Sequence, residues 1–182
     1  MMNERSIRGE PESRWEDFAI CKSTLEAIRN TCKPGTIIEF GSGVGTRRLA
    51  YSFDVISFEH DPSWIIYFAE KRITQVLAPL SQGWYNRGIV RGTLENINPT
   101  DVTGVLIDGP PHLIGRFGIL NRLDILKPFL NCPIFVDDTH RESDRILALD
   151  LAQRLGREKV NSYDCKDDDK VGVKFSVIEW TE

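Results

Sequence analysis

Three aspartates stand directly after two apolar segments of the chain. Asp108 follows the run 104–107, and Asp137 and Asp138 follow the run 133–136. If these runs are neighbouring parallel strands, the three carboxylates share one edge and repel one another unless protons or a cation compensate. Carboxylate oxygens suit Mg²⁺, Ca²⁺ or Mn²⁺. The alternative is that Asp137 and Asp138 only cap the helix that follows them, where the helix dipole favours acids.

A histidine lies close to the first of these aspartates. His112 ends the segment Gly109-Pro110-Pro111-His112, directly after Asp108. Because histidine titrates near neutral pH, His112 is a candidate general base for an acceptor group beside Asp108. A structural or substrate-contacting histidine is the alternative. His140 is a second candidate, although its place in the first turn of a predicted helix is more typical of a surface residue.

A glycine-rich turn is the other feature with chemical potential. The apolar run 36–40 ends in Gly41-Ser42-Gly43-Val44-Gly45, and an apolar segment near Leu49 follows. A strand, a glycine turn and a helix bring backbone N–H groups up to a ligand, which approaches without meeting a Cβ. A dinucleotide fingerprint would have Gly or Ala where Thr46 stands. The spacing from Glu39 is instead E-x-G-x-G-x-G, and a plain tight turn is the alternative.

Apolar runs and helical periodicities alternate along the chain and predict the elements that carry these residues. The predicted strands are 36–40, 55–58, 89–91, 104–107, 133–136, 159–163 and 173–180. The predicted helices are 13–33, a short one after Gly45, 62–73, 116–126 and 139–156, with capping boxes at 13–16 and 139–142. Segments 78–88 and 164–170 are predicted loops. This alternation favours an α/β fold with a mostly parallel sheet covered on both faces.

Chemically active side chains gather at the carboxyl ends of the predicted strands, where open α/β sheets bind ligands. The acids at or beside these ends are Glu39, Glu59, Asp61, Asp108, Asp137 and Asp138, and the histidines are His60, His112 and His140. A parallel sheet need not collect all its histidines on one edge. We therefore expect this edge to be the functional one.

The motif from Glu39 to Gly45 resembles the first motif of class I S-adenosylmethionine-dependent methyltransferases, and the resemblance covers residues 34–182. It implies a three-layer Rossmann-like fold whose seven-stranded sheet has the order 3-2-1-4-5-7-6, with the last strand antiparallel. It also implies that Glu39 helps place the methionine end of the cofactor and that Glu59 holds the ribose. The turn after strand three would lie beside the adenine. The cofactor-binding residues expected on this basis are Glu39, Gly41, Ser42, Gly43, Gly45, Glu59, His60, Thr93, Leu94 and Asp108.

The three aspartates are similar to the metal ligands of cation-dependent O-methyltransferases of the catechol and caffeoyl-CoA type. The resemblance implies a cation, Mg²⁺ or else Ca²⁺ or Mn²⁺, held by Asp108, Asp137 and Asp138. Such a cation would lower the pKa of a coordinated hydroxyl and align it with the methyl group. Two departures stand out. The lysine that this family carries after its strand-four acid is missing, which leaves Asp108 and His112 as the expected catalytic residues, and Asp138 replaces the usual asparagine.

Length and composition set the protein class. The chain has 182 residues, of which 41% are hydrophobic and 27% charged, as is ordinary for one globular domain. We expect a disordered segment at 1–12 and a single domain at 13–182, with helix 13–33 as a lid over the cofactor. A net charge of −4 argues against a broad nucleic-acid-binding face. No secretory signal or membrane span is evident, and the four cysteines (21, 32, 132, 165) lack metal-site spacing, so we expect reduced thiols and a cytoplasmic protein.

These features predict O-methylation of a small molecule, without a nucleic-acid or membrane partner. The acceptor pocket must come from the N-terminal segment, from the strand-four and strand-five loops, or from the second subunit of a homodimer. Three rivals remain open: a metal-independent small-molecule or sugar methyltransferase, an NAD-binding oxidoreductase, which Thr46 disfavours, and a non-catalytic cofactor-binding module.

Overall fold

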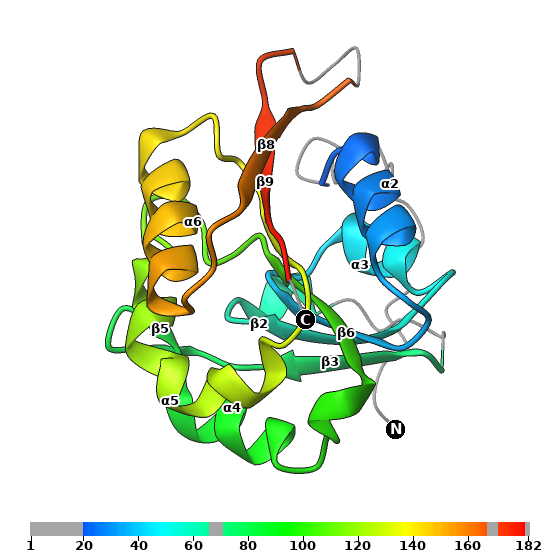
Figure 1. Ribbon diagram of the computed structural model, residues 1–182. Coiled ribbons are helices and arrows are strands. Elements are labelled where there is room, and N and C mark those ends of the chain that lie inside the picture. The colour runs from blue at the N-terminus through cyan, green and yellow to red at the C-terminus, as the bar shows by residue number, and fades with distance from the viewer. Residues whose placement is uncertain (1–19, 66–70, 167–170, 181–182) are drawn as a thin grey trace.

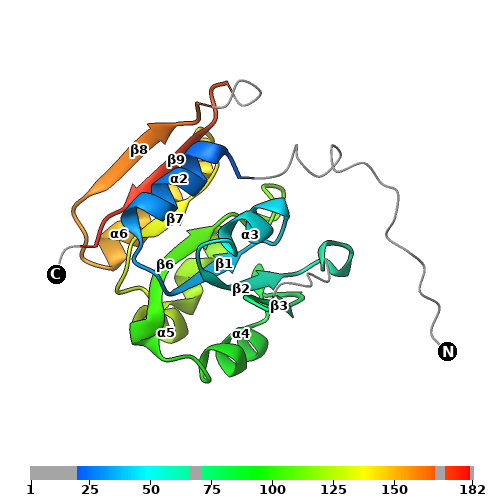
Figure 2. The ribbon, with the colours of Figure 1, turned by 90° about the vertical axis from the view of Figure 1, so that its right-hand side faces the viewer.

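The computed structural model describes residues 20–65, 71–166 and 171–180. Its main sheet has the strands β1 (Thr36–Phe40), β2 (Asp54–Glu59), β3 (Ile73–Leu77), β6 (Val102–Ile107), β7 (Ile134–Val136), β8 (Val160–Asp164) and β9 (Lys174–Ile178). Their order is β3-β2-β1-β6-β7-β9-β8. Figure 1 shows β2 beside β3 and β8 beside β9, and Figure 2 also labels β1 and β7. All pairings from β3 to β7 are parallel, whereas β9 is antiparallel to both of its neighbours. Counted along this sheet alone, the strand order is 3-2-1-4-5-7-6, which confirms the expected topology.

Helices cover both faces of the sheet. The described α-helices are α2 (Lys22–Thr31), α3 (Val44–Leu49), α4 (Arg87–Leu94), α5 (Leu123–Leu126) and α6 (Glu142–Arg154). Helices α2 and α3 pack with Ile37 and Val55 in one buried cluster, and α4, α5 and α6 pack with Ile38 and Phe40 in another. Figure 2 shows α4 and α5 on the opposite side of the strands from α3. Alternate residues of one strand therefore serve two cores, as a doubly covered parallel sheet requires.

The third strand is not where the sequence analysis put it. We predicted a strand at 89–91, but these residues lie in α4, and the sheet strand is β3, of which only Ile73 fell within a predicted element, the helix 62–73. The Asn86 side chain accepts a hydrogen bond from the backbone of Ile89 at 3.2 Å and caps α4, so that the helix tolerates Gly88 and Gly92. The predicted loop 78–88 contains the hairpin of β4 (Leu80–Ser81) and β5 (Trp84–Tyr85).

Three predicted helices also differ in detail. The segment predicted as one helix at 116–126 consists of a 3₁₀ helix, Phe117–Arg122, followed by α5. Only Pro62–Trp64 of the predicted helix 62–73 is helical among the described residues, as a 3₁₀ turn. The capping box at 139–142 is wrong, because α6 begins at Glu142 with Arg141 at its N-cap. Thr139 instead bonds to β9, through its backbone N–H to Lys174 and its hydroxyl to Ser176.

The prediction of four reduced cysteines is also wrong. Cys21, directly before α2, forms a disulfide with Cys165, directly after β8, across 144 residues of chain, while Cys32 and Cys132 are free and buried. The predicted disordered segment 1–12 and capping box 13–16 lie outside the described residues. No helix among those described is long and apolar enough to span a bilayer. The cytoplasmic location stays a prediction that the reduced-thiol premise no longer supports.

Candidate functional site

The strand register brings the expected residues to one edge. Phe40 at the end of β1 is level with Phe58 on β2 and with Ile107 on β6, and Ile107 is level with Val136 on β7. The residues that follow are therefore neighbours across this edge, where an open cavity of about 510 Å³ lies. Its lining residues are Gly41, Ser42, Glu59, His60, Trp64, Tyr85, Asp108, Gly109, Pro111, His112, Leu113, Arg116, Asp137, Asp138 and Arg141.

Two glycines allow the first loop to cross the loop after β6. Gly41 has φ of +102°, and a Cβ there would lie 2.8 Å from the backbone nitrogen of Gly109. A Cβ on Gly109 would in turn overlap the Tyr85 hydroxyl. Only glycine fits this conformation and this approach. The crossing leaves backbone, rather than side chains, at the floor of the cavity.

Glu39 lies behind the glycine loop. Its side chain is 1% exposed and does not line the cavity. It accepts a hydrogen bond of 2.6 Å from the Thr46 hydroxyl, which accepts one from the backbone N–H of Gly43 at 3.0 Å. Burial raises the pKa of Glu39 to about 7, with hydrogen bonds from Ser57 and Thr46 lowering it and Glu59 raising it. In this arrangement Glu39 holds the loop from below.

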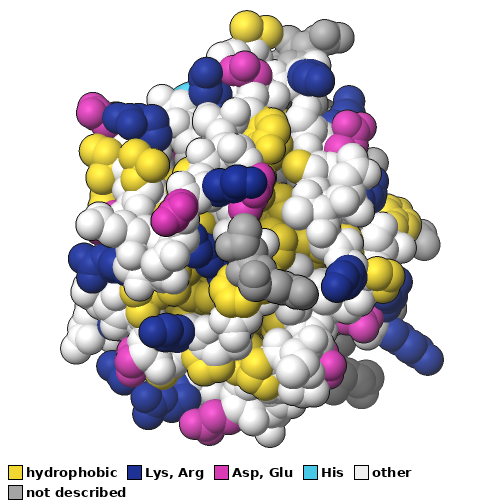
Figure 3. Space-filling model, viewed as in Figure 1, with side chains coloured by type: hydrophobic (Ala, Val, Ile, Leu, Met, Phe, Trp, Pro, Cys, Tyr) yellow, Lys and Arg dark blue, Asp and Glu magenta, His cyan; other side chains and the backbone are white. Residues whose placement is uncertain are grey.

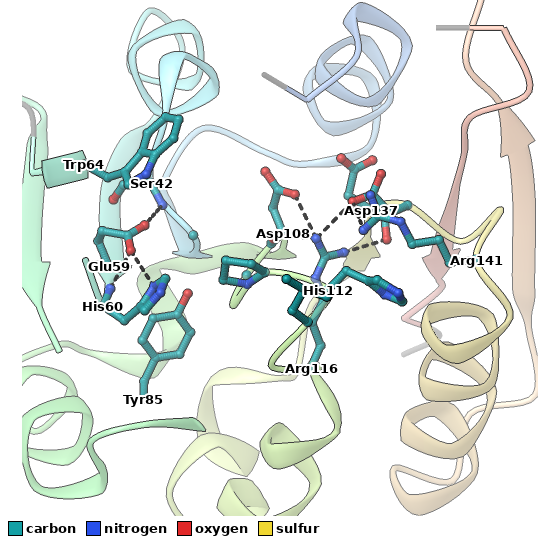
Figure 4. A pocket seen from close by; sticks show the side chains of 15 residues that line it. Ser42, Glu59, His60, Trp64, Tyr85, Asp108, His112, Arg116, Asp137 and Arg141 are labelled. Carbon is teal, nitrogen blue, oxygen red and sulfur yellow. Dashed lines mark hydrogen bonds and ion pairs between the residues drawn. The ribbon is translucent and has the colours of Figure 1, made fainter. Parts of the chain in front are cut away.

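Glu59 is the carboxylate that faces the half of the cavity next to the glycine loop. One of its oxygens accepts from the backbone N–H of Ser42 at 2.9 Å, and the other accepts from the backbone N–H groups of His60 and Asp61 at 2.6 and 2.8 Å. The His60 imidazole also lies 2.7 Å from this carboxylate (Figure 4). Glu59 is 4% exposed. Its orientation is therefore set before any ligand binds.

Besides Glu39, four of the predicted cofactor residues do not line the cavity, namely Gly43, Gly45, Thr93 and Leu94. Thr93 and Leu94 were expected in the turn after strand three, but they are the last residues of α4. Leu94 is buried in the core, and the Thr93 hydroxyl donates to the carbonyl of Ile89 within the helix. Neither lines the cavity. The misplaced third strand removes the basis of their prediction.

Three aromatic residues stand near the cavity. Tyr85 is fully buried, lines the cavity, and its hydroxyl has no hydrogen-bond partner within the described part of the chain. Its ring meets that of His60 edge-on at 6.3 Å. Trp64 lines the cavity as well, whereas Trp84, fully buried, packs against Phe40 in the core. An unpartnered hydroxyl at a cavity wall indicates a group that a ligand would satisfy.

The other half of the cavity holds the acid cluster. Asp108, Asp137 and Asp138 each offer an oxygen, and the three oxygens lie within 4.8 Å of one another. Burial raises the pKa of Asp108 well above its usual range, helped by Asp137 and opposed by Arg116. Asp138 has a left-handed φ of +59°, which aspartate tolerates. The register thus assembles the carboxylates that the sequence predicted to meet.

A buried arginine that the sequence analysis missed lies among these acids. The Arg116 guanidinium, with a side chain 3% exposed, contacts Asp108 at 3.3 Å and Asp138 at 3.1 Å through the same Nη2 atom. Figure 4 shows it between Asp108 and Asp137, with interactions on both sides. Burial alone would lower the pKa of Arg116, but the surrounding aspartates, Asp108 and Asp144 foremost, raise it. The guanidinium is therefore a fixed positive charge in the cluster.

This arrangement does not fit a divalent cation held by all three aspartates. Mg²⁺ requires oxygen ligands at about 2.0 to 2.1 Å in octahedral geometry. A single nitrogen of Arg116 already bridges Asp108 and Asp138, and Arg141 makes a further ion pair with Asp138 at 2.9 Å. A cation between these carboxylates would stand directly beside a guanidinium of the same sign.

The two histidines of this half differ in place. His112 is exposed and lines the cavity. His140 is turned toward β9, where its Nδ1 accepts from the backbone N–H of Lys174 at 3.5 Å, and it does not line the cavity. Helix α2, the described part of the expected lid, contributes no residue to the cavity either. His112 is thus the histidine that a bound acceptor would meet.

Comparisons with solved structures identify the fold. The O-methyltransferase TomG from Streptomyces achromogenes, in complex with S-adenosylmethionine, matches with a TM-score of 0.53 and 12% identity over 95% of this chain and 82% of that one. A putative rRNA-methylase from Clostridium thermocellum matches with a TM-score of 0.52 and 14% identity over 88% and 95%. MycE methyltransferase, in complex with Mg, S-adenosylhomocysteine and mycinamycin VI, matches with a TM-score of 0.51 and 12% identity over 96% and 49%.

These matches show that the chain has the class I methyltransferase fold, as the glycine motif predicted. A scan against protein-family models found no match, and neither did a search of curated proteins. Because the structural matches have low sequence identity, they establish the fold alone, and the activity must be argued from the site.

Proposed function

We propose that this protein is an S-adenosylmethionine-dependent methyltransferase that methylates an oxygen of a small-molecule acceptor. The single observation that carries the proposal is the division of one cavity into two halves. A pre-oriented carboxylate and a glycine loop form one half, and the strand-end acids and an exposed histidine line the other. The fold supports the cofactor class, since TomG, a structural neighbour, has S-adenosylmethionine bound.

The cofactor half suits a nucleoside. Glu59 would accept hydrogen bonds from the ribose hydroxyls, because its carboxylate lines the cavity and is held by backbone N–H groups. Gly41 and Ser42 offer backbone without large side chains at the cavity wall, and Tyr85 offers a hydroxyl without a hydrogen-bond partner among the described residues. Glu39 would act indirectly by holding the loop.

The acceptor half provides a route for a proton. S-adenosylmethionine, when bound, would supply an electrophilic methyl group for transfer from its sulfur to the acceptor oxygen. His112 would take the hydroxyl proton of the acceptor, since its side chain is exposed in the cavity. The Asp108 carboxylate, which is paired with Arg116 and lines the cavity, would accept a hydrogen bond from the acceptor and help to position it. The cavity wall would further favour the reaction by aligning the acceptor oxygen with the methyl group.

A small acceptor is favoured over a nucleic acid by the charge pattern. On the face drawn in Figure 3, basic and acidic side chains of the described residues are interspersed and form no basic stripe. The two arginines that line the cavity are paired with Asp108 and Asp138. Phosphate binding would need such cations free to meet the backbone of the nucleic acid. Because the Clostridium neighbour is named a putative rRNA-methylase, RNA is the alternative acceptor that the experiment must include.

The proposal is tested by transfer of a labelled methyl group from S-adenosylmethionine to a panel of phenols, catechols and sugars, with ribosomal RNA as a further substrate. We expect label in an O-methyl ether. We also expect His112→Ala to lower kcat by roughly 10²- to 10⁴-fold, while His140→Ala, turned away from the cavity, keeps it. Transfer to RNA or amines only, or wild-type kcat in His112→Ala, would contradict the assignment.

A further inference from the structure

The buried guanidinium of Arg116 is saturated by the site around it. Its Nε donates to the carbonyl of Pro110 at 3.4 Å, and Nη1 donates to the carbonyl of Asp137 at 2.9 Å and faces Asp144 at 3.7 Å. Nη2 donates to the carbonyl and the carboxylate of Asp108 and to the carboxylate of Asp138. Every nitrogen of the group is therefore engaged within the protein, which leaves none directed to an acceptor.

These contacts join the pieces that form the acceptor half. The Arg116 side chain connects the end of β6 at Asp108, the end of β7 at Asp137 and Asp138, and the first turn of α6 at Asp144. A bound divalent cation would make the same connection by drawing strand-end carboxylates together. The planar guanidinium of arginine has several N–H donors, so it can connect these strand ends through both carbonyls and carboxylates. It does this without taking up an ion from solution.

The charges agree with this role. The carboxylates of Asp108 and Asp138 contact the guanidinium directly, and Arg141 contacts that of Asp138 as well. A like charge at this distance opposes entry of a dication, and the opposition is strong because the guanidinium is 3% exposed and weakly screened. The two arginines therefore already compensate the negative charge of the acid cluster in the absence of a metal ion.

We propose that Arg116 is a built-in counter-ion that takes the place of a divalent cation in this site, so that methyl transfer proceeds without a metal ion. The inference rests on the proposed function only in its statement about methyl transfer. The exclusion of the cation follows from the contacts of Arg116 alone. Arg116 is a positioning residue, since it acts through the aspartates and not on the acceptor.

The test is a titration with Mn²⁺ followed by electron paramagnetic resonance, in which bound ions lose the signal of free Mn²⁺. We expect no Mn²⁺ uptake by the wild-type protein. Arg116→Ala should gain a Mn²⁺ site whose affinity is at least on the order of tenfold above any weak binding by the wild type, and adding Asp138→Asn should abolish that site. Arg122→Ala is the matched control, because Arg122 is also buried but bonds to the carbonyls of Asn121 and Ser81. It should gain no site.

Arg116→Gln serves if the alanine variant does not fold, since its amide keeps a donor for the carbonyls while the charge is lost. Uptake of Mn²⁺ by the wild type that Asp138→Asn removes would overturn the proposal. So would a failure of both Arg116 variants to gain a site. Binding of S-adenosylhomocysteine in chelator-containing buffer, measured on the same samples, reports separately on the proposed function. If S-adenosylhomocysteine does not bind, the methyltransferase assignment fails, whereas the Mn²⁺ result stands.

Discussion

At the residue scale, Glu59 is the contact on which cofactor affinity should depend most. Its carboxylate reaches the cavity while backbone N–H groups hold it in place. Glu59→Ala should weaken binding of S-adenosylhomocysteine by about 1 to 3 kcal/mol, because charged hydrogen bonds to the ribose are lost. Calorimetric titration measures the change.

Asp61→Ala is the matched control for this variant. It removes an acid two residues away whose side chain caps the turn at Ser63 and does not line the cavity. Affinity close to that of the wild type is expected. Equal losses in the two variants would show that the effect comes from the shared loop and not from a ribose contact.

Glu39 gives a prediction about pH. Its pKa is raised from the usual 4.5 to about 7 in the folded protein, mainly by burial, so the folded state binds a proton that the unfolded chain has released. This contribution to stability is fully present below about pH 4.5 and is lost as the pH rises through 7. Urea unfolding should show that Glu39→Gln removes a decline of about 2 to 3 kcal/mol between pH 5 and pH 8.

The control for Glu39 is Glu142→Gln, because the Glu142 side chain is 80% exposed. It should follow the wild-type pH profile. A Glu39→Gln profile parallel to that of the wild type would contradict the raised pKa of this carboxyl.

At the scale of elements, the disulfide ties the start of α2 to the end of β8. Reduction should lower the free energy of unfolding by about 2 to 5 kcal/mol, since the bond closes a long loop of the unfolded chain. Urea unfolding with and without reductant measures the effect. Cys21→Ser should be insensitive to reductant. Unchanged wild-type unfolding, together with four reactive thiols in the denatured protein, would contradict the bond.

Sequence patterns located some elements and not others, for physical reasons. Strands β1, β6 and β7 are apolar because both faces of a parallel sheet are buried, and each ends at a glycine or an acid, so their positions could be predicted. Strand β3 is only half-buried, and its apolar residues continued a helical period. Helix α4 contains two glycines, which disfavour a helix in sequence patterns. The segment is nevertheless helical, because the Asn86 side chain caps its first turn.

At the scale of the whole molecule, the strand order decided which residues meet. Adjacent strand ends follow from the alternation of elements, so Glu59, Asp108 and Asp137 could be placed on one edge from sequence. Arg116 and the disulfide could not, because a contact between a loop and two distant strand ends leaves no periodic pattern. For that reason the sequence indicated only a metal site, whereas the contacts of Arg116 lead us to propose an internal counter-ion there.

The central claim is that this edge binds S-adenosylmethionine. Calorimetric titration of the full chain with S-adenosylhomocysteine, alongside NAD⁺, tests it most directly. We predict saturable binding of S-adenosylhomocysteine with one ligand per chain and no binding of NAD⁺. Saturable NAD⁺ binding without S-adenosylhomocysteine binding, or no binding of either by protein shown to be folded, would contradict the account.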